Sequence, residues 1–283
     1  MKYSVAVIIP TYNRARTLRR ALESVFEQTR QPEEVCVIDD GSTDSTEVLV
    51  KKHFSQVIYI RQQNLGVSAA RNAGVEATSS DCVAFLDSDD EWLPKKLEVQ
   101  LSELEASPDI RLVHSDEIWI RNGKRVNQMH KHKKSGGYIF PLCLPLCAIS
   151  PSAAMLHRSL LADVGGFDES LPACEDYDLW LRICCKERVL YVDNPLLMKY
   201  GGHEDQLSKH YWGMDRFRVQ SLTKLLSSGS LDADQGRLVQ KTLLEKVTIL
   251  RNGASKRAKL EDVHYYDQLL KMHGSLISEA HDD

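Results

Sequence analysis

The sequence predicts an α/β fold in which a mostly parallel sheet carries helices on both faces and is followed by a helical extension. The first half alternates short β-rich runs with helical patterns, and this order is typical of parallel strands joined by crossover helices. Polar turns follow three of the strand candidates, at the place where such sheets bind ligands. From Tyr211 onward the pattern is helical. We therefore expect one domain over residues 1–208 and a helical extension over residues 209–283.

Each element of the first half has its own local signal. The first strand candidate is closed by Pro10, and the first helix repeats apolar residues at the spacing of an amphipathic helix. The turn DDGSTD can cap the second helix through Ser42, Thr43 or Asp44. Pro94 can open the fourth helix. The expected strands are Ser4–Ile9, Val35–Ile38, Val57–Ile60 and Val83–Leu86, and the expected helices cover Leu18–Phe26, the segment after Asp44, Val67–Ala77 and Leu97–Leu104.

The middle of the chain is less regular. Arg111–Ser115 and Ile118–Ile120 are strand candidates, and Asn122-Gly123 is a hairpin turn. Met129–Gly137 (MHKHKKSGG) is basic and ends in glycine, so we expect an exposed, mobile loop. It either closes over phosphates or meets an anionic acceptor, or is simply solvated.

The helical extension has an apolar stripe and two expected breaks, near Ser227–Ser230 and Arg251–Ser255. Such a stripe packs against the rest of the chain or a second subunit, or else lies on a membrane surface. We expect packing. The stripe consists of Met214, Phe217, Ser221, Leu222 and Leu225.

The composition excludes several classes of protein. A net charge of -4 and a pI near 6.2 argue against a general nucleic-acid binder. No apolar run approaches the ~20 residues of a membrane-spanning helix, and the N-terminal apolar run stops at a proline, unlike a signal peptide. The 7 cysteines include no CxxC pair, so reduced thiols are expected rather than a zinc site. These features indicate a cytoplasmic protein.

Carboxylates crowd together after the fourth strand candidate, in the segment FLDSDDEWL. Asp87, Asp89 and Asp90 repel one another, so an opposite charge nearby is the natural compensation. A divalent cation with oxygen ligands, Mg²⁺ or Mn²⁺, is one candidate, and an ordinary surface loop is the alternative. The turns PTYN and DDGSTD also end strands, so all three turns should share one edge of the sheet.

Five motifs in this order resemble those of a family 2 glycosyltransferase with a GT-A fold: IIPTYNRARTLRRALESVFEQT, VIDDGSTDST, NLGVSAARNAG, FLDSDDEW and GGFDESLPACEDYDLWLR. The resemblance runs from about Val5 to about Ser208. It implies transfer of a sugar from a nucleotide-sugar, usually with a divalent metal and inversion at the anomeric carbon. It also implies a nucleotide-sugar-binding half over residues 1–115 and an acceptor and catalytic half over residues 116–208.

The resemblance places the nucleotide at the first turns. Tyr12 offers a flat face on which a base can stack, and Asp40 can accept a hydrogen bond from a pyrimidine imide. Pro10 and Asp39 belong to the same base pocket. Helix capping and turn formation are the alternative for the two aspartates. Arg71 resembles an arginine that approaches the nucleotide from the base side, and a surface arginine paired with a carboxylate is the alternative.

The sequence DSD at positions 87–89 resembles the DxD motif, in which an aspartate binds a metal that bridges two phosphates. Asp89 is the first choice for the metal ligand. Asp87 and Ser88 are assigned to the nucleotide-sugar, and Asp90 reaches the sugar or only starts the turn. His203 in GGHEDQLS completes the metal site on this mapping, and a structural or exposed histidine is the alternative.

The sequence CEDYDLWLR resembles the ED motif at the start of a helix. On that mapping Asp176 is the general base that takes the proton of the acceptor hydroxyl, with Glu175 beside it. An acidic helix start that is favoured only by the helix dipole is the alternative. Asp178 should point elsewhere. Trp180 either floors the acceptor pocket or packs in the core.

Together these residues predict a metal-dependent, inverting glycosyltransferase that moves a sugar, we expect from a UDP-sugar, to a hydroxyl of a glycan or lipid-linked acceptor. Synthesis of a cell-surface polysaccharide or lipopolysaccharide would fit. A second copy of the chain and the inner face of the membrane are further candidate partners.

Two alternative functions remain at this point. A sugar nucleotidyltransferase typically has a glycine-rich loop with a basic residue after the first strand, where this chain has PTYNRAR. A non-catalytic nucleotide-sugar-binding protein would be expected to lack the metal or base carboxylates, and both motifs are intact.

Overall fold

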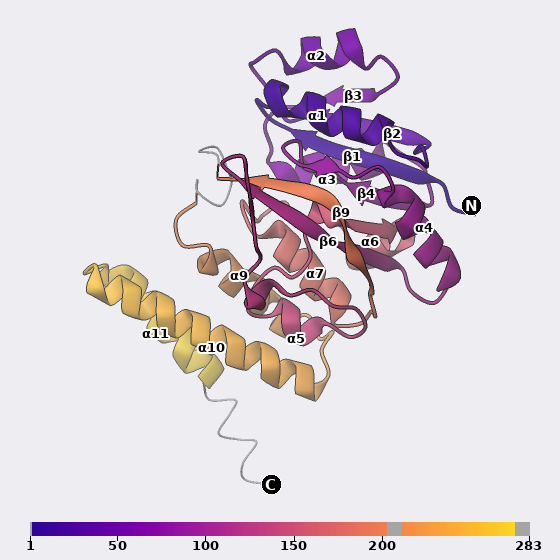
Figure 1. Cartoon of the computed structure of the whole chain (residues 1–283). Coiled ribbons are helices and arrows are strands. Elements are labelled where there is room, and N and C mark those ends of the chain that lie inside the picture. Colours follow the sequence, from indigo (N-terminus) through magenta and orange to yellow (C-terminus); the bar gives the residue numbers. More distant parts are fainter. Residues whose placement is uncertain (1, 203–210, 275–283) are drawn as a thin grey trace.

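A computed structural model describes residues 2–202 and 211–274 of the chain (Figure 1). They contain a 9-stranded mixed sheet in the order β3-β2-β1-β4-β8-β6-β9-β5, with β7 paired to β6. The strands are β1 (Val5–Thr11), β2 (Glu34–Asp39), β3 (Ile58–Arg61), β4 (Cys82–Phe85), β5 (Glu91–Trp92), β6 (Leu112–Arg121), β7 (Lys124–Val126), β8 (Ala154–His157) and β9 (Leu190–Gly201).

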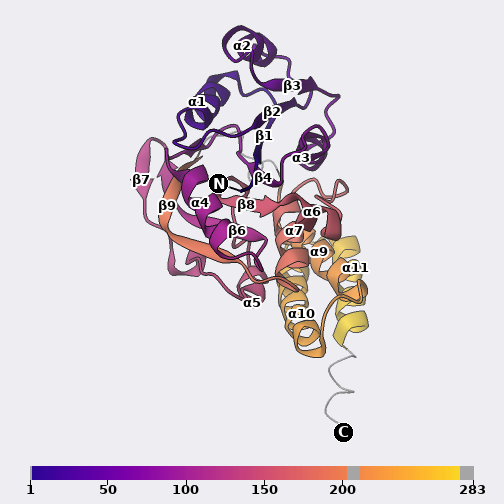
Figure 2. The same ribbon diagram turned by 90° about the vertical axis from the view of Figure 1, so that its right-hand side faces the viewer.

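Helices cover both faces of this sheet (Figures 1 and 2). One face packs against α1, α2 and α4, and the other against α3, α6 and α7, with α9, α10 and α11 beyond α7. The helices are α1 (Ala15–Phe26), α2 (Thr46–His53), α3 (Val67–Glu76), α4 (Lys96–Ala106), α5 (Phe140–Cys143), α6 (Arg158–Val164), α7 (Glu175–Cys184), α9 (Asp215–Ser227), α10 (Ala233–Lys256) and α11 (Leu260–Gly274), with 3-10 turns η1 (His130–His132) and η2 (Pro151–Ala153).

The strand directions set the position of any ligand site. β1 pairs in parallel with β2 and β4, β2 with β3, and β6 with β9. Only short strands run the other way, since β8, β5 and β7 pair antiparallel to their neighbours. All residues of β1 are buried, as expected for a central strand with helices on both faces. The predicted α/β class and the predicted order of the first half are confirmed.

Close packing of α3 on β1 depends on one glycine. A Cβ atom at Gly74 would lie 2.4 Å from Cγ2 of Ile8, which is closer than any real Cβ contact. Side chains in such interiors interdigitate at crystal-like density. Gly74 therefore allows the helix that carries Arg71 to sit directly on the sheet.

Three expectations for the second half were wrong in detail. β6 is one strand from Leu112 to Arg121 with register shifts in its middle, not two strands. The basic segment after Met129 is exposed at His130, Lys131 and Lys133, as expected, but it contains η1 and its Lys134 is buried. α10 continues without interruption through Arg251–Ser255, because one face of it is buried against the rest of the chain. Pro10 also lies inside β1 rather than beyond its end.

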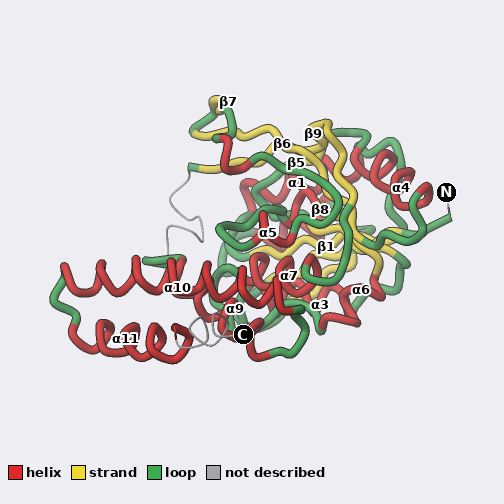
Figure 3. Tube along the Cα trace, turned by 90° about the horizontal axis from the view of Figure 1, so that it is seen from below, coloured by secondary structure: helices red, strands yellow, loops and turns green. Residues whose placement is uncertain are grey.

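The helical extension packs on the domain, as predicted. Leu222 and Leu225 of α9 are buried in the cluster that also holds residues of α7, and Met214 and Phe217 pack against it. A capping box begins α10, in which the Asp232 side chain accepts a hydrogen bond from the backbone N–H of Gln235. Figure 3 shows α10 and α11 lying side by side and extending beyond the sheet. None of the described helices is long and apolar enough to cross a membrane.

Candidate functional site

The predicted turns meet at one edge of the sheet. β1, β2 and β4 are parallel neighbours, so the segments after them leave from the same side. The turn at Asn13 is hydrogen-bonded directly to the next one: its backbone N–H donates to Ser42 Oγ at 2.8 Å, and its side-chain oxygen accepts from the Thr43 N–H at 2.7 Å. Tyr12 stands beside this junction with 47% of its surface exposed, and Pro10 is buried within β1.

Asp39 is completely buried and has local partners. Its carboxylate accepts hydrogen bonds from the Ser42 N–H at 2.7 Å and from the hydroxyl of Tyr59. The N-cap residue of α2 is Ser45, not one of the three predicted residues, and its side chain makes no capping hydrogen bond. Of the three, Asp44 contacts the helix start by accepting from the Thr46 N–H at 3.0 Å. Asp39 therefore organises its own turn, and its contact with a base stays a prediction.

Asp40 ties down the turn that precedes α3. Its Oδ1 accepts from Gln62 Nε2 at 2.7 Å and from the Leu65 N–H at 2.9 Å, and Oδ2 accepts from the Gly66 N–H at 2.8 Å. Gly66 has a φ of 94°, a left-handed conformation that favours glycine. Asp40 thus fixes the backbone next to the expected base pocket, and its contact with the base also stays a prediction.

Arg71 joins the two halves of the site. Its Nη2 lies 2.7 Å from Asp87 Oδ1, and its Nη1 lies 2.7 Å from Glu175 Oε1. The arginine is buried, and its guanidinium also lies 5.0 Å from the ring centre of Phe167. Burial raises the pKa of Glu175, as does neighbouring Asp176, while Arg71 opposes both. Arg71 is therefore no ordinary surface residue, and its contact with a nucleotide stays a prediction.

The three aspartates after β4 have different environments. Asp87 and Asp89 keep 28% and 20% of their side chains exposed, and Asp89 Oδ2 lies 3.5 Å from Arg14 Nη1. Asp90 is buried, and its Oδ2 accepts from Ser152 Oγ at 2.6 Å. Burial and then Asp89 raise the pKa of Asp90 well above its ordinary value. Asp90 therefore belongs to the turn, whereas the other two carboxylates reach the surface.

The predicted base begins a helix beside these carboxylates. α7 starts at Glu175, and Asp176 is half-buried, with Oδ2 accepting from the thiol of Cys147 at 3.2 Å. Asp178 points elsewhere, as expected, and lies 2.8 Å from Arg182 Nε. Trp180 is completely buried in the core, so it packs and does not floor an acceptor pocket.

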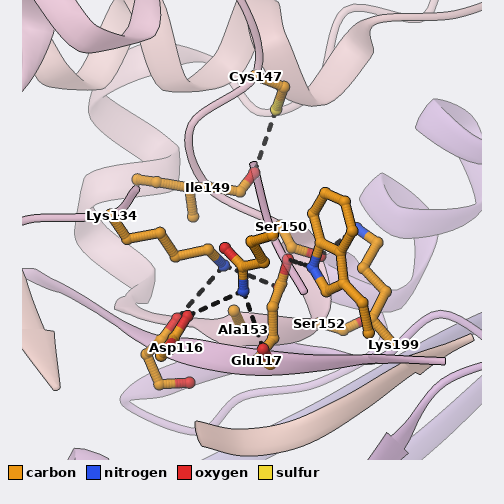
Figure 4. A network of polar contacts seen from close by, with 12 residues as sticks. Asp116, Glu117, Lys134, Cys147, Ile149, Ser150, Ser152, Ala153 and Lys199 are labelled. Atoms are coloured by element: carbon orange, nitrogen blue, oxygen red, sulfur yellow. Dashed lines mark hydrogen bonds and ion pairs between the residues drawn. The ribbon is translucent and has the colours of Figure 1, made fainter. Parts of the chain in front are cut away.

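A segment that was not predicted from the sequence makes hydrogen bonds to the aspartates of the candidate site. Cys147–Ser152 (CAISPS) supplies the Cys147 thiol to Asp176, and Ser152 Oγ both donates to Asp90 and accepts from the Asp87 N–H at 3.1 Å. Figure 4 shows the segment with its neighbours. Its alternating small polar residues are too common a pattern to have identified it.

Lys199 is the second missed residue. Its ammonium donates to Ser150 Oγ at 2.6 Å (Figure 4). Burial alone would lower the pKa of Lys199, but attraction by Glu117, Asp90, Asp87 and Asp176 outweighs it and raises the pKa. A charged residue in the apolar strand PLLMKYG was a signal that could have marked it.

A buried ion pair adjoins this network. Lys134 Nζ lies 2.8 Å from Glu117 Oε2, and both side chains are almost completely buried. Burial would raise the pKa of Glu117, but Lys134 and then Lys199 lower it to about 2. The pair joins the basic segment to β6 in the interior of the protein (Figure 4).

The exposed carboxylates are of a chemical type that binds divalent cations. Asp87 and Asp89 offer hard oxygen ligands at the surface. Within residues 2–202 and 211–274, however, no three His, Cys, Asp or Glu side chains gather as a complete metal site. The remaining ligands would therefore have to come from a bound diphosphate, water or other residues. The predicted ligand His203 lies outside the described residues.

Comparison with known proteins gives a consistent result. The sequence model of the family described as Glycosyl transferase family 2 matches residues 6–165. An uncharacterized glycosyltransferase of Rickettsia felis is 34% identical over 194 residues, which are 68% of this chain and 32% of that protein. The chain thus spans about a third of the length of the first curated relatives that it matches.

Solved structures share the fold at low sequence identity. S. aureus TarS 1-349 in complex with UDP-GlcNAc is 22% identical, with a TM-score of 0.74 over 95% of this chain and 80% of that one. The mannosyltransferase PcManGT from Pyrobaculum calidifontis, in complex with GDP-Man and Mn2+, is 18% identical, with a TM-score of 0.62 over 99% of this chain and 86% of that one. Both likenesses establish the GT-A arrangement of the sheet and helices.

Proposed function

Because the chain belongs to glycosyltransferase family 2, we propose that it transfers a sugar from a nucleotide-sugar to a hydroxyl group of a glycan or lipid-linked acceptor, with inversion. Residues 1–208 would form the transferase domain, and residues 209–283 the helical extension. One observation carries the proposal: Arg71 lies 2.7 Å from both Asp87 and Glu175. The expected donor-binding turn and the expected catalytic helix start are therefore joined around one place.

The donor would lie along the edge formed by the ends of β1, β2 and β4. The exposed ring of Tyr12 can stack on the base, and Asp40 holds the backbone of the neighbouring turn. A pyrimidine, as in a UDP-sugar, is our choice of base. The S. aureus TarS complex with UDP-GlcNAc, which shares the fold, is compatible with this choice.

Asp89, the ligand predicted from the sequence, would hold a divalent metal, Mg²⁺ or Mn²⁺, against the donor diphosphate. The partly exposed Asp87 beside it, which the sequence assigned to the nucleotide-sugar, would be a second ligand. When bound, such an ion stabilises the negative charge of the departing nucleoside diphosphate as a Lewis acid. The chain's own contribution is to keep both carboxylates in place: Arg71 orients Asp87, and the Ser152 hydroxyl orients the turn through Asp90 and the Asp87 N–H. The Mn2+ complex of the Pyrobaculum mannosyltransferase is consistent with this reading.

Asp176 would remove the proton of the acceptor hydroxyl as it attacks the anomeric carbon. Its neighbour Glu175 is paired with Arg71, which leaves Asp176 as the half-buried carboxylate of the pair. The thiol of Cys147 holds one oxygen of Asp176. Direct displacement by the activated hydroxyl then inverts the configuration of the sugar.

Two kinds of acceptor fit the proposed function: a glycan, or a lipid-linked saccharide of a cell-surface polysaccharide or lipopolysaccharide. A lipid-linked acceptor would bring the protein to the cytoplasmic face of a membrane. A second copy of the chain is a further proposed partner, for which the exposed side of α10 offers a surface.

Replacing Asp176 with Asn tests the proposal. We expect transfer from a panel of UDP-sugars and GDP-sugars to fall by at least about a hundredfold, whereas donor binding measured by calorimetry stays nearly unchanged. The matched control is Asp178→Asn, whose carboxylate pairs with Arg182 away from the site. Normal turnover by the Asp176→Asn protein would refute the base assignment. For the unaltered chain, release of pyrophosphate would point instead to a nucleotidyltransferase, and donor binding without any turnover to a non-catalytic binder.

A further inference from the structure

Three cations gather around one exposed indole at the start of the helical extension. Trp212 keeps 49% of its surface exposed. The guanidinium carbon of Arg257 lies 4.5 Å from the centre of its ring, Lys259 Nζ lies at 5.0 Å, and the guanidinium carbon of Arg216 lies at 5.0 Å. The cluster thus joins the segment before α9 to the turn between α10 and α11.

The cluster carries more positive charge than its neighbours neutralise. Lys259 lies 4.0 Å from Asp262, but among the described residues no carboxylate lies within ion-pair distance of Arg216 or Arg257. The nearby Asp215 is already shared by Arg218 and Lys246. Like charges held together at a surface repel one another, so a bound anion would stabilise this arrangement.

Arg216 is held in a defined orientation. Its Nε and Nη2 both donate to the backbone carbonyl of Trp212, at 3.1 and 2.6 Å. Its Nη1 has no hydrogen-bond partner in the part of the chain that the structure describes. A guanidinium fixed on one side and open on the other is well suited to a phosphate or carboxylate group.

The segment that carries Trp212 and Arg216 contacts the start of the candidate catalytic helix α7. The thiol of Cys174, the residue directly before Glu175 and Asp176, donates to the Met214 carbonyl at 3.7 Å. Met214 is two residues beyond Trp212. The turn between α10 and α11 also projects toward the side to which β6 and β9 run (Figures 1 and 3), which is the side of the donor-binding edge.

We propose that Trp212, Arg216, Arg257 and Lys259 form a subsite for a phosphate group of the acceptor. The inference rests on the proposed transferase function and narrows the acceptor to a molecule that carries phosphate near the hydroxyl it offers. The phosphate would belong either to a lipid-linked saccharide, whose diphosphate joins sugar to lipid, or to a phosphorylated glycan. The indole can pack on the sugar or the lipid beside the phosphate.

Binding measurements test this subsite without any transfer reaction. Geranyl diphosphate and glucose 6-phosphate are titrated into the full chain by calorimetry, with geraniol and glucose as uncharged counterparts. Saturating UDP and Mg²⁺ keep the donor site occupied. The test variant is Arg257→Ala/Lys259→Ala, and the control is Arg237→Ala/Lys241→Ala, which removes two cations from α10 itself. A charge-preserving variant, Arg257→Lys/Lys259→Arg, checks that charge and not packing is measured.

We expect at least one phosphate compound to bind the unaltered chain and to bind the test variant at least about tenfold more weakly. The control and charge-preserving variants should bind as the unaltered chain does. Preference for geranyl diphosphate would identify the lipid-linked source, and preference for glucose 6-phosphate the glycan source; either supports the subsite. Equal binding by the test variant, equal binding of the uncharged counterparts, or no phosphate binding to the unaltered chain would overturn it.

Failure of the proposed function remains distinguishable. Hydrolysis or transfer of a nucleotide-sugar by the unaltered chain tests that function, and the phosphate titration does not depend on it. An active enzyme that does not bind the phosphate compounds would refute the subsite but not the transferase function. Phosphate binding by a chain that never cleaves a nucleotide-sugar would sink the transferase function, and with it the assignment of the phosphate to an acceptor.

Discussion

Replacing Arg71 with Met should destabilise the fold far more than removal of an equally paired surface arginine. Arg71 is buried between Asp87 and Glu175, and the Glu175 side chain is only 6% exposed. Removing one partner of a buried ion pair costs about 3 to 5 kcal/mol, which corresponds to roughly 10 °C in melting temperature for a chain of this size. Most of the cost comes from Glu175, because Asp87 can still reach water.

Arg111 provides the matched control. It also bridges two carboxylates, with Nη1 2.5 Å from Asp163 and Nη2 2.6 Å from Glu187, but the arginine is 29% exposed and Asp163 58% exposed. Exposed pairs contribute about 0 to 1 kcal/mol each. Arg111→Met should therefore lower the free energy of unfolding, measured in urea at pH 7, by much less than Arg71→Met does.

The pH dependence identifies Glu175 as the cause. Burial already raises the pKa of Glu175 above its ordinary 4.5, and loss of Arg71 raises it further. Between 4.5 and the raised pKa, the folded variant binds a proton that the unfolded chain has lost, so its stability falls as pH rises through that window. The deficit of Arg71→Met should thus shrink on acidification toward pH 5, and Arg71→Met/Glu175→Gln should recover much of it at pH 7. A deficit no larger than that of Arg111→Met, or no recovery with Glu175→Gln, would refute the reasoning.

Three further predictions concern the surrounding network. Lys199→Met should reduce the rate of transfer at least about tenfold, because the ammonium lies among the carboxylates of the site. Donor binding measured by calorimetry should be retained. Unchanged turnover would show that Lys199 has no part in catalysis. The lowered pKa of Glu117, about 2 against an ordinary 4.5, contributes about 3 kcal/mol above pH 4.5 that is lost as pH falls toward 2, so urea unfolding of Glu117→Gln should lack this acid-dependent loss. Gly74→Ala should lower the free energy of unfolding by about 1 to 3 kcal/mol, because the added methyl group overpacks against Ile8. Gly236→Ala on α10 has open space around its Cβ position and should raise the free energy of unfolding by up to about 1 kcal/mol. Similar melting temperatures for these two variants would contradict the packing argument.

Local patterns predicted the first half well because its strands are short and three of the four predicted strands are almost completely buried. Val5–Thr11 and Glu34–Asp39 are near-continuous apolar runs, which is the sequence of parallel strands covered on both faces. The turns after these strands are polar because they lie where such sheets bind ligands, and the sheet topology brings the turns to one edge. The common edge of the turns that we expect to bind the donor could therefore be predicted from the order of strands and helices alone.

Long-range pairing was not accessible in this way. Arg71 and Glu175 are 104 positions apart, and neither motif contains a signal that predicts the ion pair between them. Packing also overrode local propensity in α10, where Asn252, Gly253 and Ser255 suggested a break, yet Leu250 and Ala254 are buried against the rest of the chain. Helix propensities differ by only about 1 kcal/mol per residue, so burial of one face is sufficient to carry the helix through.

The pairing of charges at the candidate site bears on how a donor can enter it. Each carboxylate group there is near a cation that the chain itself supplies: Arg14 lies near Asp89, Arg71 near Asp87 and Glu175, and Lys199 lies among Asp87, Asp90 and Asp176. Arg71 is buried and doubly paired, so a diphosphate could recruit it only by breaking contacts whose loss costs several kcal/mol. A donor that brings its own divalent cation avoids that cost, since the cation can use the exposed oxygens of Asp87 and Asp89 while Arg71 keeps its place. On the proposed function, the arrangement would favour binding of the donor and the metal as one unit, with Arg71 as a fixed support rather than a phosphate ligand.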